Sequence, residues 1–131
     1  MQIQVAVICD AATETHGKLN LLGAFDAINA HRLPWTHPQC SIALRVTFNQ
    51  VEEGAHKLRL NLVDEDGQPV MPSIDLAVEV KIPDDNHFVT SNLIVGIQQL
   101  KFDKPGHYSI DVTFDGHQET SIPLLVKFFP P

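Results

Sequence analysis

The sequence predicts an all-β fold, an antiparallel two-sheet β-sandwich with roughly seven to nine strands. Two observations predict this fold class. Apolar and polar residues alternate one by one along most of the chain, and short turn signals separate the alternating segments. A period of two places one face of each strand on a core and the other face in water, as antiparallel sheets do.

The alternating segments follow one another in chain order. Residues 1–5 alternate like a strand, and so do residues 41–48, 57–62, 74–82 and 107–114. Their expected core residues are Ile42, Leu44, Val46, Phe48, Leu58, Leu60, Leu62, Ile74, Leu76, Val78, Val80, Ile82, Tyr108, Ile110, Val112 and Phe114. The turn signals between segments are Glu53-Gly54, Asp66-Gly67, Pro83-Asp84-Asp85-Asn86, Pro105-Gly106 and Asp115-Gly116.

Residues 19–30 are the one segment that also fits a helix. Leu21, Phe25 and Ile28 have the spacing of a helical apolar stripe. Gly23 would cost a helix about 1 kcal/mol relative to Ala, whereas in a strand it suits a bulge or a bend. We therefore expect one long bent strand here.

The hairpin over residues 108–124 indicates its own register. An unbulged two-residue turn would place polar residues of the second strand on the core face. A bulge, or a three-residue loop, instead pairs Ile110 with Ile122 and Tyr108 with Leu124. Because a slip of one residue reverses every side chain, the hydrophobic pattern selects the bulged form.

The composition limits the class of partner. The chain has 131 residues, and 9 Lys and Arg against 16 Asp and Glu give a net charge of −7. With 44% hydrophobic and 19% charged residues, it is expected to form a single β-sandwich domain over residues 1–131. Nucleic acids and anionic membranes attract concentrated Lys and Arg, so we expect neither as a partner.

The sequence predicts a cytoplasmic location. The longest stretch without a charged residue, residues 86–100, is too short and too polar to span a bilayer. The first residues show no basic region followed by a long apolar run. Cys9 and Cys40 are expected to be buried free thiols in a reducing compartment, because a disulfide would need an oxidising one.

Residues 102–112 resemble the corner before strand F of immunoglobulin-like domains. In such corners a tyrosine precedes a core residue by two positions, and its hydroxyl bonds backward to the backbone. Tyr108 and Ile110 occupy these two positions. The resemblance implies an immunoglobulin-like sandwich.

The whole chain is also similar to a small bacterial family of unknown function. The resembling residues are Ile8-Cys9-Asp10-Ala11, residues 17–26, Glu53-Gly54-Ala55-His56 and Asp64-Glu65-Asp66-Gly67. The resemblance implies a bacterial, cytoplasmic, all-β protein. It supplies no catalytic residues.

Successive strands of a sandwich run up and down, so the loops are expected to gather at two ends. The first end would collect Asp10, Glu14, His16, Glu52, Glu53, Asp84, Asp85, His87, Asp115 and His117, with Lys18 as the only base nearby. The second end would collect His31, Trp35, His37, Asp64, Glu65 and Asp66. The acidic first end could bind Ca²⁺, but Asp and Glu also suit short turns, and no loop has EF-hand spacing.

A second metal hypothesis concerns His31 and His37, which could hold Zn²⁺ together with Cys40 or Asp26. The sequence has no tight ligand pair such as C-x-x-C or H-x-x-x-H. The weak metal candidates are therefore His31, His37, Asp84 and Asp85, and no cofactor is expected.

Apolar residues near the C-terminus and one tryptophan predict an interaction surface. Trp35 lies in an expected proline-flanked loop, where it could anchor a protein contact or cover one end of the core. The expected last strand, residues 121–129, carries Leu125, Phe128 and Phe129 on both faces. We expect this strand to present an exposed edge or an apolar patch that invites a partner.

No catalytic motif occurs, and Cys9 is the only nucleophile worth naming. The neighbouring Asp10 would raise the pKa of that thiol and make the thiolate scarcer. The sequence therefore predicts a non-enzymatic cytoplasmic module for protein–protein contact or self-association, with Trp35, Phe128 and Phe129 as interaction residues. The alternative is a sandwich that binds a small ligand or a divalent metal through loop Asp, Glu and His residues. A hydrolase, the third class, finds no support in the sequence.

Overall fold

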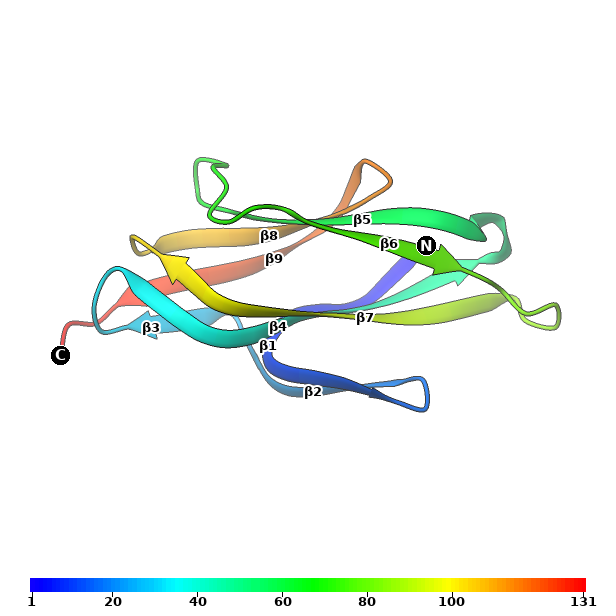
Figure 1. Ribbon diagram of the computed structural model, residues 1–131, viewed down its shortest axis with the longest axis horizontal. Helices are drawn as coiled ribbons and strands as arrows, with labels where there is room; N and C mark the ends of the chain where they lie inside the picture. The colour runs from blue at the N-terminus through cyan, green and yellow to red at the C-terminus, as the bar shows by residue number, and fades with distance from the viewer.

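The computed structural model describes residues 1–131. It has nine strands and one short helix: β1 (Gln2–Thr15), β2 (Lys18–Phe25), β3 (Ala27–Ala30), β4 (Trp35–Asn49), η1 (Gln50–Glu52), β5 (Gly54–Val63), β6 (Ile74–Val80), β7 (Phe88–Phe102), β8 (Gly106–Phe114) and β9 (His117–Phe128). The strands form a four-stranded sheet, β2-β1-β4-β7, and a five-stranded sheet, β3-β9-β8-β5-β6 (Figure 1). No helix is long and apolar enough to cross a membrane.

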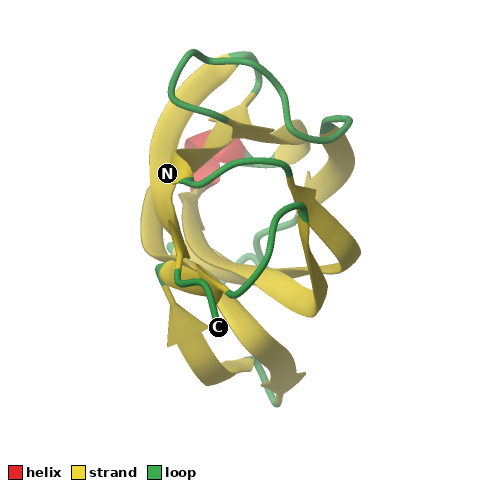
Figure 2. Cartoon of the chain, turned by 90° about the vertical axis from the view of Figure 1, so that its left-hand side faces the viewer, coloured by secondary structure: helices red, strands yellow, loops and turns green.

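One hydrophobic core lies between the two sheets. Viewed along the strands, the sheets curl around the space that the core side chains fill (Figure 2). Phe48 of β4, Leu58 of β5 and Val112 of β8 are all 0% exposed. The predicted core faces are confirmed, except that Ile74 and Leu76 are only partly buried because β6 is an edge strand.

The expectation of a fully antiparallel sandwich is wrong at one place. β3 pairs with β9 in parallel, from Ala27 beside Leu125 to Ala30 beside Phe128. One sheet is therefore mixed. The chain crosses from one sheet to the other just before β3, where the Asp26 carbonyl accepts a hydrogen bond from the Leu125 amide (2.8 Å).

The same crossing corrects the prediction for residues 19–30. They are extended, as expected, but they form two strands in different sheets instead of one bent strand. Gly23 adopts a left-handed φ of 65° within β2. Changing sheets after Phe25 allows Ile28 and Ala30, 5% and 0% exposed, to join the core.

Of the two predictions for the last strand, an exposed edge is wrong for its C-terminal half. β9 lies between β8 and β3, so its C-terminal half is paired on both sides. The short strand β3 pairs with the side of β9 that was expected to be free. Phe128 and Phe129 are nevertheless exposed, because they lie beyond the end of the core.

The predicted register of the last hairpin is confirmed. Ile110 pairs with Ile122 and Tyr108 pairs with Leu124, and an irregularity follows Val112. The structure therefore uses a bulge to keep the apolar side chains on the core face. The Tyr108 hydroxyl donates to the Lys104 carbonyl oxygen (2.5 Å), the backward bond of a tyrosine corner. The immunoglobulin-like assignment itself stays a prediction.

The β1–β2 hairpin covers part of the outer face of the four-stranded sheet. Cys9 and Ala43 are 0% exposed, yet neither belongs to the core between the sheets. The Gly17 carbonyl at the hairpin turn accepts hydrogen bonds from Arg45 Nη1 and Asn92 Nδ2, each at 3.1 Å. These contacts hold the hairpin against β4 and β7, as its position below them in Figure 1 shows.

Candidate functional site

Four aromatic or imidazole residues lie where β3 ends, β4 begins and β9 ends. We call this group, His31, Trp35, Phe128 and Phe129, the aromatic corner. The His31 ring lies edge-on to the Trp35 ring, with centroids 6.5 Å apart. His31 Nδ1 donates to the Phe129 carbonyl oxygen at 3.2 Å. The fold thus brings together the three predicted interaction residues, although Trp35 and Phe128 are far apart in the sequence.

The exposed phenylalanines are held in ordered backbone positions. Phe128 and Phe129 are 43% and 51% exposed. The Phe129 amide donates to the Ala30 carbonyl (2.8 Å), and Phe128 pairs with Ala30 in the β3–β9 ladder. Large apolar side chains on a fixed backbone lose little conformational entropy when they are covered.

Trp35 does not lie in a loop, which corrects the prediction. It is the first residue of β4, where it pairs with the fully buried Phe102 and packs against the core. Its Nε1 atom is buried without a hydrogen-bond partner, and so is Nδ1 of His37. Each such group costs about 1–3 kcal/mol. Packing therefore decides the position of Trp35, as expected for a side chain that covers the end of a core.

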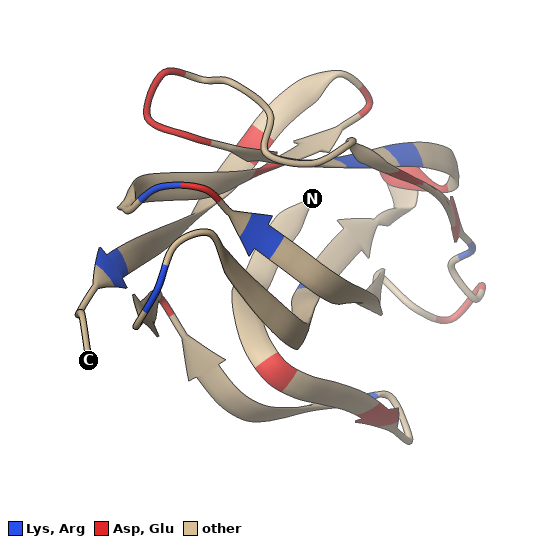
Figure 3. Ribbon diagram, turned by 60° about the vertical axis from the view of Figure 1, so that its left-hand side comes forward, with Lys and Arg blue, Asp and Glu red and all other residues tan.

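Three basic residues lie on the strands and the loop at the aromatic corner, although the chain as a whole is acidic. Arg32 lies in the adjoining loop, Lys127 pairs with Asn29 in the β3–β9 ladder, and Lys101 lies opposite Thr36. Lys and Arg are visible at this end, near the C-terminus (Figure 3). The one acidic contact recorded here is Asp103, 3.7 Å from Lys101.

A groove of about 380 Å³ adjoins the corner. Asp10, Phe25, Trp35 and His37 contribute to its lining. Burial lowers the pKa of His37, and the nearby Asp10 carboxylate only partly offsets this. The imidazole is therefore neutral at neutral pH, and Asp10 carries the only formal charge in the groove.

The place of Asp10 differs from the prediction that it belongs to the acidic end. β1 continues to Thr15, so the expected loop 10–17 shrinks to a turn at His16 and Gly17. Asp10 consequently lies in a strand, beside the residues predicted for the opposite end.

The acidic end does gather the remaining predicted loops. Gln50 Nε2 donates to the Asn86 carbonyl (3.0 Å), which joins the η1 segment to the turn that carries Asp84 and Asp85. Glu53 Oε1 accepts from the Ile82 amide (2.9 Å). The second contact gives the Glu53 side chain a structural role at a turn.

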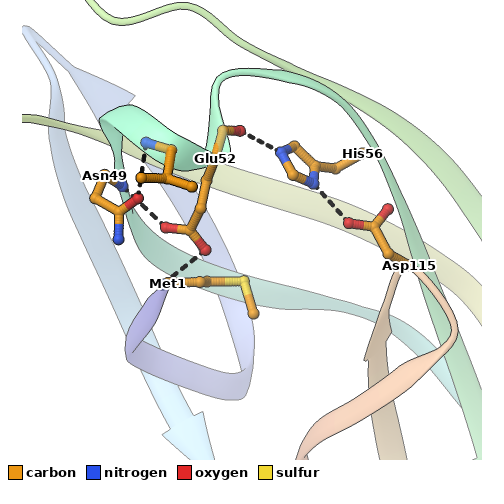
Figure 4. Close-up of polar contacts among 6 residues, drawn as sticks. Met1, Asn49, Glu52, His56 and Asp115 are labelled. Carbon is orange, nitrogen blue, oxygen red and sulfur yellow. Dashed lines mark hydrogen bonds and ion pairs between the residues drawn. The ribbon is translucent and has the colours of Figure 1, made fainter.

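A histidine organises the centre of this end (Figure 4). His56 Nδ1 lies 2.6 Å from Asp115 Oδ2, and Nε2 faces the Glu52 carbonyl oxygen. Both ring nitrogens meet acceptors, an arrangement that favours the doubly protonated imidazolium. The hydrogen bond to Asp115, followed by that to the Glu52 carbonyl, raises the pKa of His56.

The N-terminal ammonium supplies a second positive charge at the acidic end. The Met1 nitrogen lies 2.7 Å from Glu52 Oε2. Glu52 also closes a capping box with Asn49, and these contacts lower its pKa against the opposing effect of burial. Met1 and His56 were not predicted as the compensating charges. The contacts of Met1 with Glu52 and of His56 with Asp115 join residues too distant in the chain for any spacing rule to reveal.

The metal candidates do not converge. No three His, Cys, Asp or Glu side chains are arranged to hold a metal ion. His31 belongs to the aromatic corner, His37 to the groove, and Asp84 and Asp85 to the far end.

The two cysteines are buried and free, as predicted. Cys40 belongs to the core, whereas Cys9 lies outside it and its thiol faces the Ser41 carbonyl at 3.6 Å. Burial raises the pKa of both thiols, that of Cys40 to about 11. Neither is activated as a nucleophile.

The fold and its surface define an all-β, two-sheet protein with an aromatic corner and no assembled metal centre. Comparison of the sequence with known families gives a more specific result. The chain belongs to a family of unknown function, DUF6941, whose sequence profile matches residues 4–127. No curated protein matches the chain. The similarity to a family of unknown function is confirmed, and the bacterial origin stays a prediction.

Proposed function

We propose that this protein is a non-enzymatic cytoplasmic module that binds another protein through the aromatic corner. One observation carries the proposal: Phe128 and Phe129 are exposed while their backbone is held by hydrogen bonds to β3 and His31. Exposed aromatic side chains on ordered backbone are typical anchors of protein interfaces. The free thiols support the cytoplasmic location.

The charges around the corner favour a particular partner. Arg32 lies in the loop between β3 and β4, Lys127 lies in β9 and Lys101 lies opposite Thr36 of β4, in a protein whose net charge is −7. An apolar segment flanked by carboxylates would cover the rings and pair with these bases, and it would be steered to this end. We therefore expect a partner that presents hydrophobic side chains between acidic residues.

The test compares capture by three forms of the tagged protein in lysate of the native host. The wild type, the double variant Phe128→Ala/Phe129→Ala and the control Leu22→Ala each serve as bait. Leu22 is 69% exposed on β2, so its truncation removes apolar surface away from the corner. The proposal expects one specific protein, identified by mass spectrometry, with the wild type and the control but not with the double variant.

A purified complex then tests the charges. The double variant Arg32→Glu/Lys127→Glu should weaken binding about tenfold or more at low salt and less at high salt. Capture of the same proteins by the wild type and the phenylalanine variant, or no specific capture at all, would refute the proposed function.

A second candidate function is the binding of a small organic cation in the groove. Asp10 provides a negative charge there, and Phe25 and Trp35 provide aromatic surface. Choline should raise the melting temperature of the wild type and leave that of Asp10→Asn unchanged, whereas dimethylbutanol, its uncharged isostere, should shift neither. Equal shifts for the two compounds would contradict this candidate.

A further inference from the structure

The two sheets have four edge strands, and three of them are protected against pairing with another strand. β3 has only four residues. β6 carries Asp75 and Glu79, and Asp75 pairs with Arg59. β2 is bent at Gly23 and belongs to the hairpin that folds over the sheet. Short length, charge and irregular geometry are the usual ways in which proteins block edge-to-edge association.

The fourth edge, β7, has neither short length nor charge to protect it. It runs from Phe88 to Phe102, and its first charged residue is Lys101. It pairs with β4 along one side only. None of the hydrogen bonds outside the strand ladders uses its backbone. A row of backbone donors and acceptors is therefore free from Phe88 to Gln98, until the left-handed φ of 56° at Gln99 interrupts the strand.

The core-facing side chains near the free edge are incompletely covered. Val89, Leu93 and Val95 pack against the core but remain only partly buried. On the other face of the strand, Phe88 is 57% and Ile94 is 36% exposed. A further strand beside β7 would cover apolar side chains on both faces and satisfy the free backbone groups.

We propose that a second copy of this chain supplies that strand, so that β7 pairs with β7 of the partner subunit in antiparallel orientation about a two-fold axis. The two four-stranded sheets then become one continuous sheet. With the axis at Leu93, this residue faces the partner's Leu93, and Val89 faces the partner's Ile97. Two of the three kinds of core-facing pair are thus apolar on both sides, and in the third Ser91 faces the partner's Val95.

Charge and symmetry favour pairing of β7 with β7 of a second copy over pairing of β7 with another edge strand of that copy. Two copies of a protein with a net charge of −7 repel each other, but residues 88–98 contain no charged residue. Antiparallel self-pairing over these residues therefore opposes no like charges. Pairing of β7 with β2 or β6 of another copy would leave edges free and produce an open polymer, whereas the two-fold pairing closes.

The inference is independent of the aromatic corner, because β7 and the corner phenylalanines belong to different sheets. Sedimentation equilibrium from micromolar to near-millimolar protein tests it directly. We expect a plateau at twice the 14.5 kDa chain mass. The dimer should strengthen as salt rises, because salt screens the repulsion between two acidic bodies while the interface itself is uncharged. A monomer throughout, or a mass that grows without a plateau, would overturn the proposal.

Two substitutions locate the interface. Ile94→Lys and Gly96→Lys each place a charge on the outer face of the paired strands. A Cβ at Gly96 meets no atom within 4 Å, and its φ is not left-handed, so this variant should fold. Ile94→Lys should weaken dimerisation about tenfold or more, because the two introduced charges then lie diagonally across the axis from each other. Gly96→Lys places its two charges farther from the axis and should weaken dimerisation less. Leu22→Lys, on the other edge of the same sheet, is the control and should dimerise like the wild type.

Hydrogen exchange provides a readout at the strand itself. The amides of residues 88–98 that point away from β4 should become protected as wild-type concentration rises, and they should remain unprotected in Ile94→Lys. A dimer that persists in both lysine variants, or that forms without added protection in β7, would overturn the assignment to this edge.

Discussion

His56 and Asp115 are 59 positions apart in the chain, and a hydrogen bond of 2.6 Å joins their side chains. The His56 ring also stacks on Phe48, with centroids 5.5 Å apart, so the imidazolium connects the core to the acidic end. Asp115 in turn accepts from the Lys57 amide at 2.9 Å, which ties the β8–β9 turn to β5. One protonated ring thereby holds three segments of the chain together.

This contact predicts a pH dependence of stability. The pKa of His56 is raised in the folded state above its ordinary value of 6.5. The stabilisation is therefore fully present below about pH 6.5 and is lost as pH rises through the higher folded value. His56→Gln should lower stability by roughly 1 kcal/mol near pH 5.5, given solvent screening, and by less at pH 8.5. Thermal unfolding of both proteins across this range measures the difference.

Substitution of an acceptor that faces His56 provides the control for this prediction. Asp115 and Glu52 are its acceptors, the Met1 ammonium contacts Glu52, and His117 lies near Asp115. Asp115→Asn should bring the pKa of His56, read by NMR titration, back toward 6.5. A wild-type pKa at or below 6.5 would contradict the predicted imidazolium.

Gly23 predicts a site that tolerates no side chain. Its φ is 65°, and a Cβ built there would collide with the Asp10 carboxylate. Gly23→Ala should cost about 1–2 kcal/mol from the left-handed backbone, together with the cost of displacing Asp10. Gly17→Ala is the matched control, because Gly17 has a φ of 76° with open space around it. Urea unfolding should show the larger loss at Gly23, and Asp10→Ala in the same chain should remove the difference.

The buried thiols should be unreactive in the native protein. Burial is the main cause that raises the pKa of both thiols, that of Cys40 to about 11. At pH 8 the thiolate fraction of Cys40 is then about 100-fold below that of an ordinary cysteine. Iodoacetamide should label neither cysteine until denaturant is added. Rapid labelling of Cys40 in the folded protein would show that the core opens there.

The tyrosine corner predicts a small and separable loss. Tyr108→Phe removes the hydroxyl that donates to the Lys104 carbonyl but keeps the ring, whose centroid is 4.9 Å from that of Phe102. The substitution should cost about 1 kcal/mol. Tyr108→Leu, which also removes the aromatic contact, should cost more. Equal losses in urea unfolding would indicate that the hydrogen bond contributes nothing.

The aromatic corner and the groove show why a site is harder to predict than a strand. The sequence singled out Trp35, Phe128 and Phe129 as exposed or half-buried apolar side chains, and the structure places them together. It could not indicate that His31 would join them through the Phe129 carbonyl, nor that Asp10 would lie beside His37. Each of these contacts depends on which strands become neighbours.

The sequence alone predicted the strands around residues 1–5, 41–48, 57–62, 74–82 and 107–114, their core faces and the bulged register of the last hairpin. A period of two shows locally which side of a strand is apolar. The strand β7 was not among those predicted. Only the tertiary structure decided that β3 leaves the sheet of β2 to pair with β9, that the first hairpin folds over β4, and that β7 remains a free edge. Alternation states which face of a strand is buried but not which strand lies beside it. That choice depends on packing between segments distant in the chain, and each surface proposed here for binding follows from it.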